Sequence, residues 1–167
     1  MPRRTILVAA ALVLVLFGGR IAAQRAEDRS APDGVEATVT RVVDGDTVHV
    51  DLDGADETVR YIGVDTPESV KPGTPVECFA KEASARNAAL VDGEDVRLRF
   101  DAERRDRYGR LLAYVYRARD GLFVNERLVR DGYARPLTIP PNVRHANRFA
   151  ALARRAREDD RGLWSAC

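Results

Sequence analysis

The sequence predicts an α+β fold, an OB-fold barrel of five strands with three added helices. Two observations indicate this fold. Residues 35–64 are rich in β-branched residues that roughly alternate with polar ones, which is typical of strands. After residue 64, segments whose apolar residues have helical spacing are followed by segments in which apolar and polar residues alternate as in a strand. A predicted helix therefore separates the third strand from the fourth. Five strands in this arrangement fit an OB-fold barrel.

Turn signals divide the strand-rich region. Asp44-Gly45 and Asp53-Gly54 are residue pairs that favour tight turns. We interpret residues 51–54 as a hairpin turn and not as a calcium loop, because the rest of an EF-hand pattern is missing. The predicted strands are 35–43, 46–52, 57–64, 96–100 and 111–116.

Three helices are predicted in the remainder of the domain. Residues 78–91 are rich in alanine and end at Asp92-Gly93, and a short helix over 124–130 is stopped by Gly132. The last helix is predicted from Asn142, as its cap, to about residue 159. Several aromatic residues are expected to have structural roles. Tyr61, Tyr114, Tyr116 and Phe123 should pack in the core, Trp164 should be structural, and His145 should be a surface or capping residue.

The first 34 residues are not expected to belong to this domain. Arg3-Arg4 precede an apolar run over 5–19, and Ile21-Ala22-Ala23 offers a cleavage site, which is the layout of a secretory signal peptide. An uncleaved signal anchor and a cytoplasmic protein with an unusually apolar start are the alternatives. We expect a signal peptide or anchor over 1–23, a linker over 24–34 and an exported domain over 35–167. That domain would be secreted or held at the membrane by residues 5–19.

The cysteines and the charge balance limit the class of protein. In an exported protein, Cys78 and Cys167 are more often bridged than free. We therefore predict a disulfide bond; the alternative is a buried Cys78 with a free Cys167. Residues 31–167 carry 22 Lys and Arg against 24 Asp and Glu, a balance of −2. A strongly basic surface, typical of nucleic-acid-binding modules, is therefore absent, and binding a polyanion would rely on local arginines and a cation.

Residue types that suit phosphodiester chemistry are concentrated between residues 44 and 68. A hairpin could bring Asp46 and Asp65 together as oxygen ligands for Ca²⁺, Mg²⁺ or Mn²⁺. Arg60 and Arg110 can donate in bidentate fashion to phosphate oxygens, and Glu68 is a candidate base. Taken singly, each segment could be a plain turn or a solvated loop. Their combination favours cleavage of a phosphodiester.

Taken in order, these motifs resemble the staphylococcal nuclease family. The resemblance covers most of the chain. The matching blocks are Val42–Val48, Arg60, Val64–Glu68, Lys81–Ser84, Asp106–Tyr114, Val124–Glu126, Leu128–Gly132 and Gly162–Ser165.

The resemblance implies the same barrel and a Ca²⁺-dependent nuclease that hydrolyses DNA and RNA with little sequence specificity. It implies that water attacks phosphorus and leaves 3′-phosphate products, with single-stranded or frayed substrates preferred. Mg²⁺ and Mn²⁺ remain alternative cations. The implied roles are cation binding for Asp46, Asp65 and the Thr66 carbonyl, support for Asp44, and catalysis for Arg60, Glu68 and Arg110.

Substrate contacts are implied at two further positions. Arg107 stands where the family usually has a lysine that contacts a terminal phosphate, and Tyr108 where a tyrosine packs near the nucleotide. The chain departs from the family just before the last helix, where residues 135–141 contain no counterpart of the usual tyrosine pair. Base stacking on aromatic rings contributes about 1–3 kcal/mol, so we expect weaker binding or a different base preference with catalysis retained.

Two other functions fit the fold. The first alternative is a non-catalytic OB-fold module that binds nucleic acid, since the scaffold can persist without active residues. The second is an unrelated exported barrel that binds oligosaccharide, which leaves the arginine and carboxylate spacing unexplained. We expect a monomer whose only contact with a membrane is an uncleaved N-terminal segment.

Overall fold

The computed structural model describes residues 34–69, 73 and 75–167. The predicted signal peptide or anchor over 1–23 and most of the predicted linker lie outside the described residues. Within the described part of the chain, no helix is both long enough and apolar enough to cross a membrane.

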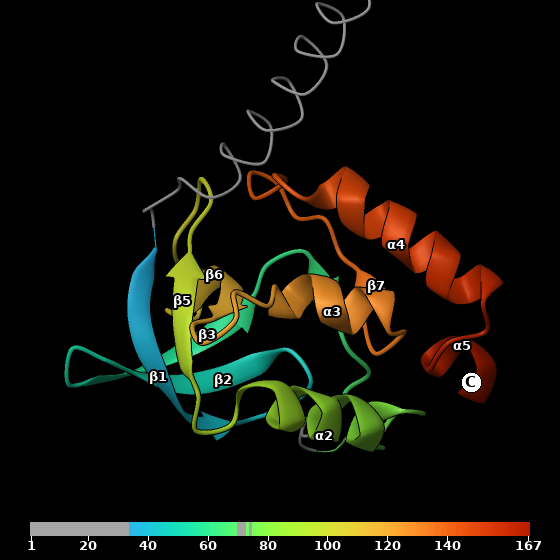
Figure 1. Ribbon diagram of the computed structural model, residues 1–167, viewed down its shortest axis with the longest axis horizontal. Coiled ribbons are helices and arrows are strands. Elements are labelled where there is room, and N and C mark those ends of the chain that lie inside the picture. Colours follow the sequence, from blue (N-terminus) through green and yellow to red (C-terminus); the bar gives the residue numbers. More distant parts are fainter. Residues whose placement is uncertain (1–33, 70–72, 74) are drawn as a thin grey trace, which may run out of the picture. The chain divides into compact units, whose positions relative to one another are not determined.

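Five strands close a barrel, as predicted (Figure 1). Around the barrel they follow the order β1-β2-β3-β6-β5, and every neighbouring pair is antiparallel except the parallel pair β3 and β6. Their bounds are β1 Val35–Val42, β2 Thr47–Leu52, β3 Ala55–Tyr61, β5 Asp95–Arg99 and β6 Leu111–Arg117. The α+β class and the OB-fold are thereby confirmed.

The alternating sequence builds the barrel interior. In β2, Val48 and Val50 are fully buried, while the intervening His49 and the following Asp51 are more exposed. The hairpin between β2 and β3 turns at Asp53 and Gly54, which have φ of 53° and 84°. Asp51 Oδ1 accepts a hydrogen bond from the Gly54 N–H at 2.7 Å. Residues 51–54 therefore form the predicted hairpin turn.

The third strand is shorter than predicted. β3 ends at Tyr61, and the chain turns at Gly63, whose φ is +79°. It resumes as β4, Val64–Asp65, which pairs with β7, Arg135–Pro136, in a separate two-stranded sheet. The end of β3 lies between the beginning of β2 and the beginning of β6. Arg60 pairs with Thr47 of β2 on one side and with Leu112 of β6 on the other.

Within the described residues, three helices lie where they were predicted, and a fourth, short helix was not predicted. Their bounds are α2 Ala80–Val91, α3 Val124–Arg130, α4 Ala146–Glu158 and α5 Leu163–Ala166. α2 begins two residues later than predicted because Phe79 has a φ of 68°, outside the helical region. α3 contacts both β6 and α4 (Figure 1).

One prediction for the start of the last helix was wrong. Asn142 does not cap α4. It is buried four residues earlier, where its side chain accepts a hydrogen bond from the Glu103 N–H and donates one to the Glu103 carbonyl. His145 occupies the cap position, as predicted, although its side chain makes no capping hydrogen bond. Its ring centroid lies 4.6 Å from that of Tyr114 and 5.8 Å from that of Phe149. Apolar contacts therefore decide the place of His145.

The core contains the predicted aromatic residues. Tyr61 and Tyr114 are buried, and Tyr116 and Phe123 are partly buried against them. The predicted disulfide bond between Cys78 and Cys167 is present and closes a separation of 89 residues. The alternative of a free Cys167 is therefore wrong.

The buried Asn125 joins α3 to the barrel. Its Oδ1 accepts a hydrogen bond from the Val115 N–H at 2.9 Å. Its Nδ2 donates to the carbonyls of Ile62 at 2.9 Å and Ala113 at 3.3 Å. Since Ile62 follows β3 directly, this side chain also fixes the turn that leads toward Asp65.

Candidate active site

An acidic turn between β1 and β2 forms one wall of the candidate site. Asp44 Oδ1 accepts a hydrogen bond from the Asp46 N–H at 3.0 Å, which shapes the turn. Gly45 is required because a Cβ there would lie 2.6 Å from Thr66 Oγ1. The close approach allows Asp46 Oδ2 to accept hydrogen bonds from the Thr66 N–H at 2.8 Å and hydroxyl at 3.0 Å.

Helix α2 fixes the position of this turn. Asn87, fully buried on α2, donates from Nδ2 to the Asp44 carbonyl at 2.9 Å. Its Oδ1 accepts a hydrogen bond from the Tyr61 hydroxyl at 3.0 Å. One amide thus connects the helix, the acidic turn and the end of β3.

Arg60 connects the two candidate ligand carboxylates. Its Nε lies 3.2 Å from Asp46 Oδ1, and its Nη2 lies 3.0 Å from Asp65 Oδ1. Its Nη1 donates to the backbone carbonyls of Tyr61 at 3.1 Å and Val64 at 2.8 Å. Four partners hold the guanidinium in one orientation, which preorganises a donor for an anion.

Burial makes the Asp46 carboxylate unusual. Only 4% of the residue is exposed, and this burial, together with repulsion from Asp44, raises the pKa of Asp46 to about 6. The Arg60 charge and the hydrogen bonds from Thr66 act in the opposite direction without cancelling the effect. An additional cation would favour the ionised carboxylate.

Arg110 is held by a turn just before β6. Asp106 Oδ2 accepts from Arg110 Nε at 2.7 Å, and Asp106 Oδ1 accepts from the backbone N–H groups of Tyr108 and Arg110. Burial raises the pKa of Asp106, but these hydrogen bonds outweigh it and hold the pKa below its usual value. Asp106 therefore stays ionised and orients Arg110.

Glu68 follows the Thr66-Pro67 pair at the edge of the same site. Its N–H donates to Glu77 Oε2 at 3.1 Å, and its carbonyl accepts from the Glu77 N–H at 3.0 Å. A small cavity of about 90 Å³ brings together all the residues predicted for catalysis and cation binding. It is lined by Asp44, Asp46, Thr47, Arg60, Asp65, Thr66, Pro67, Glu68 and Arg110.

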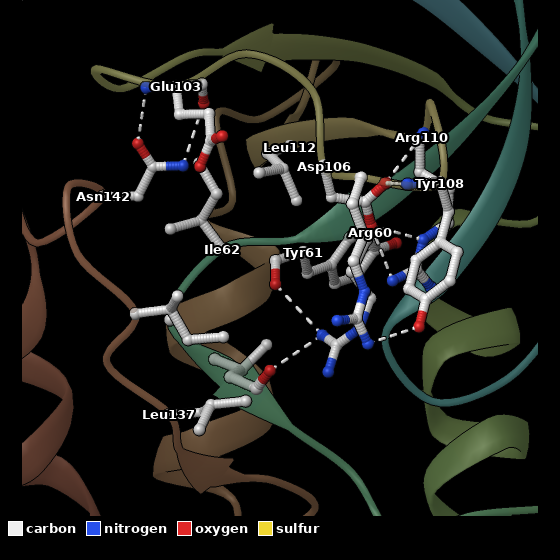
Figure 2. Close-up of a pocket in the computed structure, with 14 residues that line it drawn as sticks. Arg60, Tyr61, Ile62, Glu103, Asp106, Tyr108, Arg110, Leu112, Leu137 and Asn142 are labelled. Carbon is white, nitrogen blue, oxygen red and sulfur yellow. Dashed lines mark hydrogen bonds and ion pairs between the residues drawn. The ribbon is translucent and has the colours of Figure 1, made fainter.

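A larger cavity of about 500 Å³ adjoins the small one, with Arg60 and Arg110 lining both. Figure 2 shows Tyr108 and Arg110 on one side of it, and Leu137 and Asn142 on the other. The predicted substrate residues Arg107 and Tyr108 line this cavity, where Arg107 Nη2 donates to the Tyr108 hydroxyl at 2.6 Å. Tyr108 is 68% exposed and accessible to a ligand.

The donor atoms of the small cavity suit a hard cation. Asp46, Asp65 and Thr66, the three residues predicted to bind a cation, all line this cavity. Carboxylate and backbone carbonyl oxygens are the ligand types that Ca²⁺ and Mg²⁺ prefer. In the part of the chain that is described, no group of three or more His, Cys, Asp or Glu side chains could hold a metal ion. A cation at this site would therefore complete its coordination with backbone or water oxygens.

Several residues that build the site were not predicted to have a role in it. Asp106 opens the segment Asp106-Arg-Tyr-Gly-Arg110, and an aspartate three residues before a glycine is a turn signal that could have identified it. Leu137 and Ile139 gave no such signal, because an exposed aliphatic residue in a loop has no distinctive pattern. They are 38% and 60% exposed and line the larger cavity.

This arrangement is typical of one class of protein, the enzymes that hydrolyse phosphodiesters. Two fixed arginines, a buried carboxylate, an oxygen-rich cavity and an adjoining, partly apolar cavity together suit the binding and hydrolysis of a phosphodiester.

Comparison with known proteins identifies the family. The sequence profile described as "Staphylococcal nuclease homologue" matches residues 58–166. The thermonuclease of Staphylococcus intermedius is 39% identical over 161 residues, which is 95% of each chain. The thermonuclease of Staphylococcus hyicus is 42% identical over 127 residues, covering 76% of this chain and 74% of that protein. Endonuclease YncB of Bacillus subtilis is 43% identical over 133 residues, covering 78% and 62%. The chain belongs to the staphylococcal nuclease family and is by class a hydrolase, a nuclease.

Proposed function

We propose that this protein is an extracytoplasmic, Ca²⁺-dependent phosphodiesterase that hydrolyses DNA and RNA with little sequence preference. The observation that carries the proposal is the small cavity in which Asp46, Asp65, Arg60, Glu68 and Arg110 meet. Water would attack phosphorus, and the bond to the 5′ oxygen would break to leave a 3′-phosphate.

The side chains divide the work of this reaction. Arg60 and Arg110 donate hydrogen bonds to the phosphate oxygens, where negative charge increases in the transition state. Glu68 accepts a proton from the attacking water or orients it. Asp106 holds Arg110 for this purpose, at 2.7 Å from its Nε.

The oxygen atoms of Asp46, Asp65 and the Thr66 carbonyl would hold the cation, while Asp44 supports the turn. When bound, the cation supplies Lewis-acid stabilisation of the phosphate charge. The raised pKa of Asp46 supports this assignment, because a buried carboxylate gains most from an added positive charge. Ca²⁺ is the proposed ion, with Mg²⁺ and Mn²⁺ as the alternatives for the test.

The larger cavity would receive a base of the substrate. Tyr108 offers an exposed ring on which a base can stack, and Leu137 and Ile139 offer aliphatic contacts in place of further rings. A base reaches such a cavity only when it is unstacked, which favours single-stranded or frayed substrates. The proposed active form is a monomer, because the residues of one chain are sufficient to line both cavities.

The disulfide bond supports an extracytoplasmic location. Disulfide bonds persist in oxidising compartments and are rare in the cytosol. The bridge between Cys78 and Cys167 fits the export that residues 1–23 predict, and the protein would be secreted or anchored by residues 5–19.

The direct test uses the full chain with denatured DNA and with RNA, in Ca²⁺, Mg²⁺, Mn²⁺ or chelator. Ca²⁺-dependent degradation to 3′-phosphate ends is expected. Glu68→Ala and Arg110→Ala should each lower kcat by at least ~10²-fold, the loss typical of a missing base or transition-state donor.

Two matched variants control for charge and for general effects on the fold. Glu82→Ala removes an exposed carboxylate from α2, and Arg119→Ala removes an exposed arginine from the loop after β6; both should keep wild-type turnover. Near-wild-type turnover in Glu68→Ala and Arg110→Ala would refute the site. Tight binding without cleavage under every cation would favour the non-catalytic binding module.

A further inference from the structure

We propose that Glu77 is a positioning residue for Glu68, and that the Cys78–Cys167 bridge anchors it to the C-terminal end of the chain. The inference rests on the proposed function, in which Glu68 serves as the base. It adds Glu77 and the disulfide bond to the groups that position the Glu68 carboxylate.

Glu77 binds both backbone polar groups of Glu68. The Glu68 N–H donates to the Glu77 carboxylate at 3.1 Å, and the Glu68 carbonyl accepts from the Glu77 N–H at 3.0 Å. The two residues are nine positions apart in the sequence. The backbone of Glu68 is therefore held by one residue whose own position must be fixed.

The residues after Glu77 fix it in two ways. Its carbonyl accepts a hydrogen bond from the N–H of Ala80, the first residue of α2, at 3.1 Å. Cys78, the next residue, is bonded to Cys167. A shift of Glu77 would therefore have to move either the start of α2 or the C-terminus.

The C-terminus is itself a firm anchor. The Leu163 N–H of α5 donates to the Gly132 carbonyl at 2.9 Å, and Leu163 is 1% exposed. The approach is so close that a Cβ on Gly132, whose φ is +78°, would overlap the Arg161 carbonyl. α5 is thus fixed against the end of α3, and the bridge transfers this restraint to Cys78.

Upstream and downstream contacts complete the support of Glu68. Thr66 is bound to Asp46 through its N–H and hydroxyl, and Pro67 has a fixed φ. The hydroxyl of Ser69 lies 3.2 Å from that of Ser84 on α2. The contacts with Glu77 bind the backbone of Glu68 itself.

A positioning role predicts a specific kinetic pattern. Glu77→Ala should lower kcat by about 10-fold, the lower end of the loss seen when supporting hydrogen bonds of a site are removed, with little change in KM or in Ca²⁺ affinity. Glu77→Gln keeps an acceptor oxygen and should restore most of kcat. Replacing Cys78 and Cys167 together with serine should also lower kcat, and adding Glu77→Ala to that variant should give less than the product of the two effects.

The experiment measures kcat, KM and Ca²⁺ binding for these variants in the full chain, at a temperature where circular dichroism shows each of them folded. Glu77→Ala is also made in a Glu68→Ala background, where it should have no further effect because Glu77 acts through Glu68. Glu82→Ala, which removes the same charge five residues along the chain, should match the wild type.

The outcomes separate this inference from the proposed function. If Glu68→Ala loses activity while Glu77→Ala keeps the wild-type kcat, or if Glu77→Gln fails to restore it, the positioning role is wrong and the proposed function stands. If the serine variant keeps full kcat, the anchoring by the bridge is wrong. If Glu68→Ala itself retains wild-type turnover, the proposed function fails first.

Discussion

Asparagine in place of Asp46 should abolish activity and also remove a pH-dependent loss of stability. Asp46 lies in the acidic turn of the site, with its side chain only 6% exposed, and its pKa is raised from 3.8 to about 6. At neutral pH the fold must hold this carboxylate ionised in surroundings that favour the protonated acid. The site therefore costs stability whenever no cation compensates the charge.

The size and sign of the effect follow from the two pKa values. A tenfold change in an equilibrium corresponds to about 1.4 kcal/mol, so raising the pKa from 3.8 in the unfolded chain to about 6 in the fold costs about 3 kcal/mol. Below about pH 4 the carboxyl is protonated in both states and the cost disappears. As the pH rises from about 4 to about 6, the unfolded chain loses its proton first, and stability falls. Above the folded pKa the cost is complete.

The substitution also has an effect that does not depend on pH. The amide of asparagine has one acceptor oxygen, which can still serve Thr66, whereas its NH₂ group would face Arg60 Nε. Arg60 keeps its contacts with Asp65 and with the carbonyls of Tyr61 and Val64. We therefore expect a constant loss of about 1 kcal/mol, the usual value of one hydrogen bond, on which the pH-dependent gain is superimposed.

Urea unfolding of wild type and Asp46→Asn in chelator, from pH 4 to pH 8, measures the prediction. The free energy of unfolding of the variant minus that of the wild type should increase by about 2–3 kcal/mol between pH 4 and pH 7. Adding Ca²⁺ should stabilise the wild type and leave the variant nearly unchanged, since only the wild type retains the full ligand set. A difference that is flat with pH, or that decreases, would refute the reasoning about burial.

Three further predictions follow from individual contacts. Asn125→Ala should lower the free energy of unfolding by about 3 kcal/mol, because it strips buried backbone groups such as the Val115 N–H of their partner; a loss below ~1 kcal/mol in urea denaturation would contradict this. Replacing Cys78 and Cys167 with serine should cost about 4–5 kcal/mol, from the entropy of closing an 89-residue loop, and an unchanged melting temperature would exclude that estimate. Tyr108→Ala should raise KM for single-stranded DNA, in line with a stacking contribution of about 1–3 kcal/mol, and should leave kcat nearly unchanged; an unaltered KM would mean that no base stacks on this ring.

The barrel could be predicted because its signals are local. Alternation in β2 and the Asp53-Gly54 turn act over a few residues, and the structure has both. The end of β3 and the start of α4 could not be predicted in the same way. β3 ends just before the turn at Gly63, where Asn125 donates a hydrogen bond to the Ile62 carbonyl. Asn142 does not cap α4 because its side chain binds the backbone of Glu103. Both outcomes depend on partners far away in the sequence.

The sequence by itself determined which residue types are available for chemistry. Its motifs identified Asp46, Arg60, Asp65, Glu68 and Arg110, because carboxylates and arginines at turns and strand ends are recognisable without knowing their neighbours. Only the tertiary structure decided how these groups are held. Burial of Asp46 between two turns raises its pKa, Arg60 joins two carboxylates across the end of β3, and Asp106 and Glu77 restrain Arg110 and Glu68. The physical reason is that a pKa or an orientation depends on every group within a few ångströms, and the folded chain brings those groups together from distant positions.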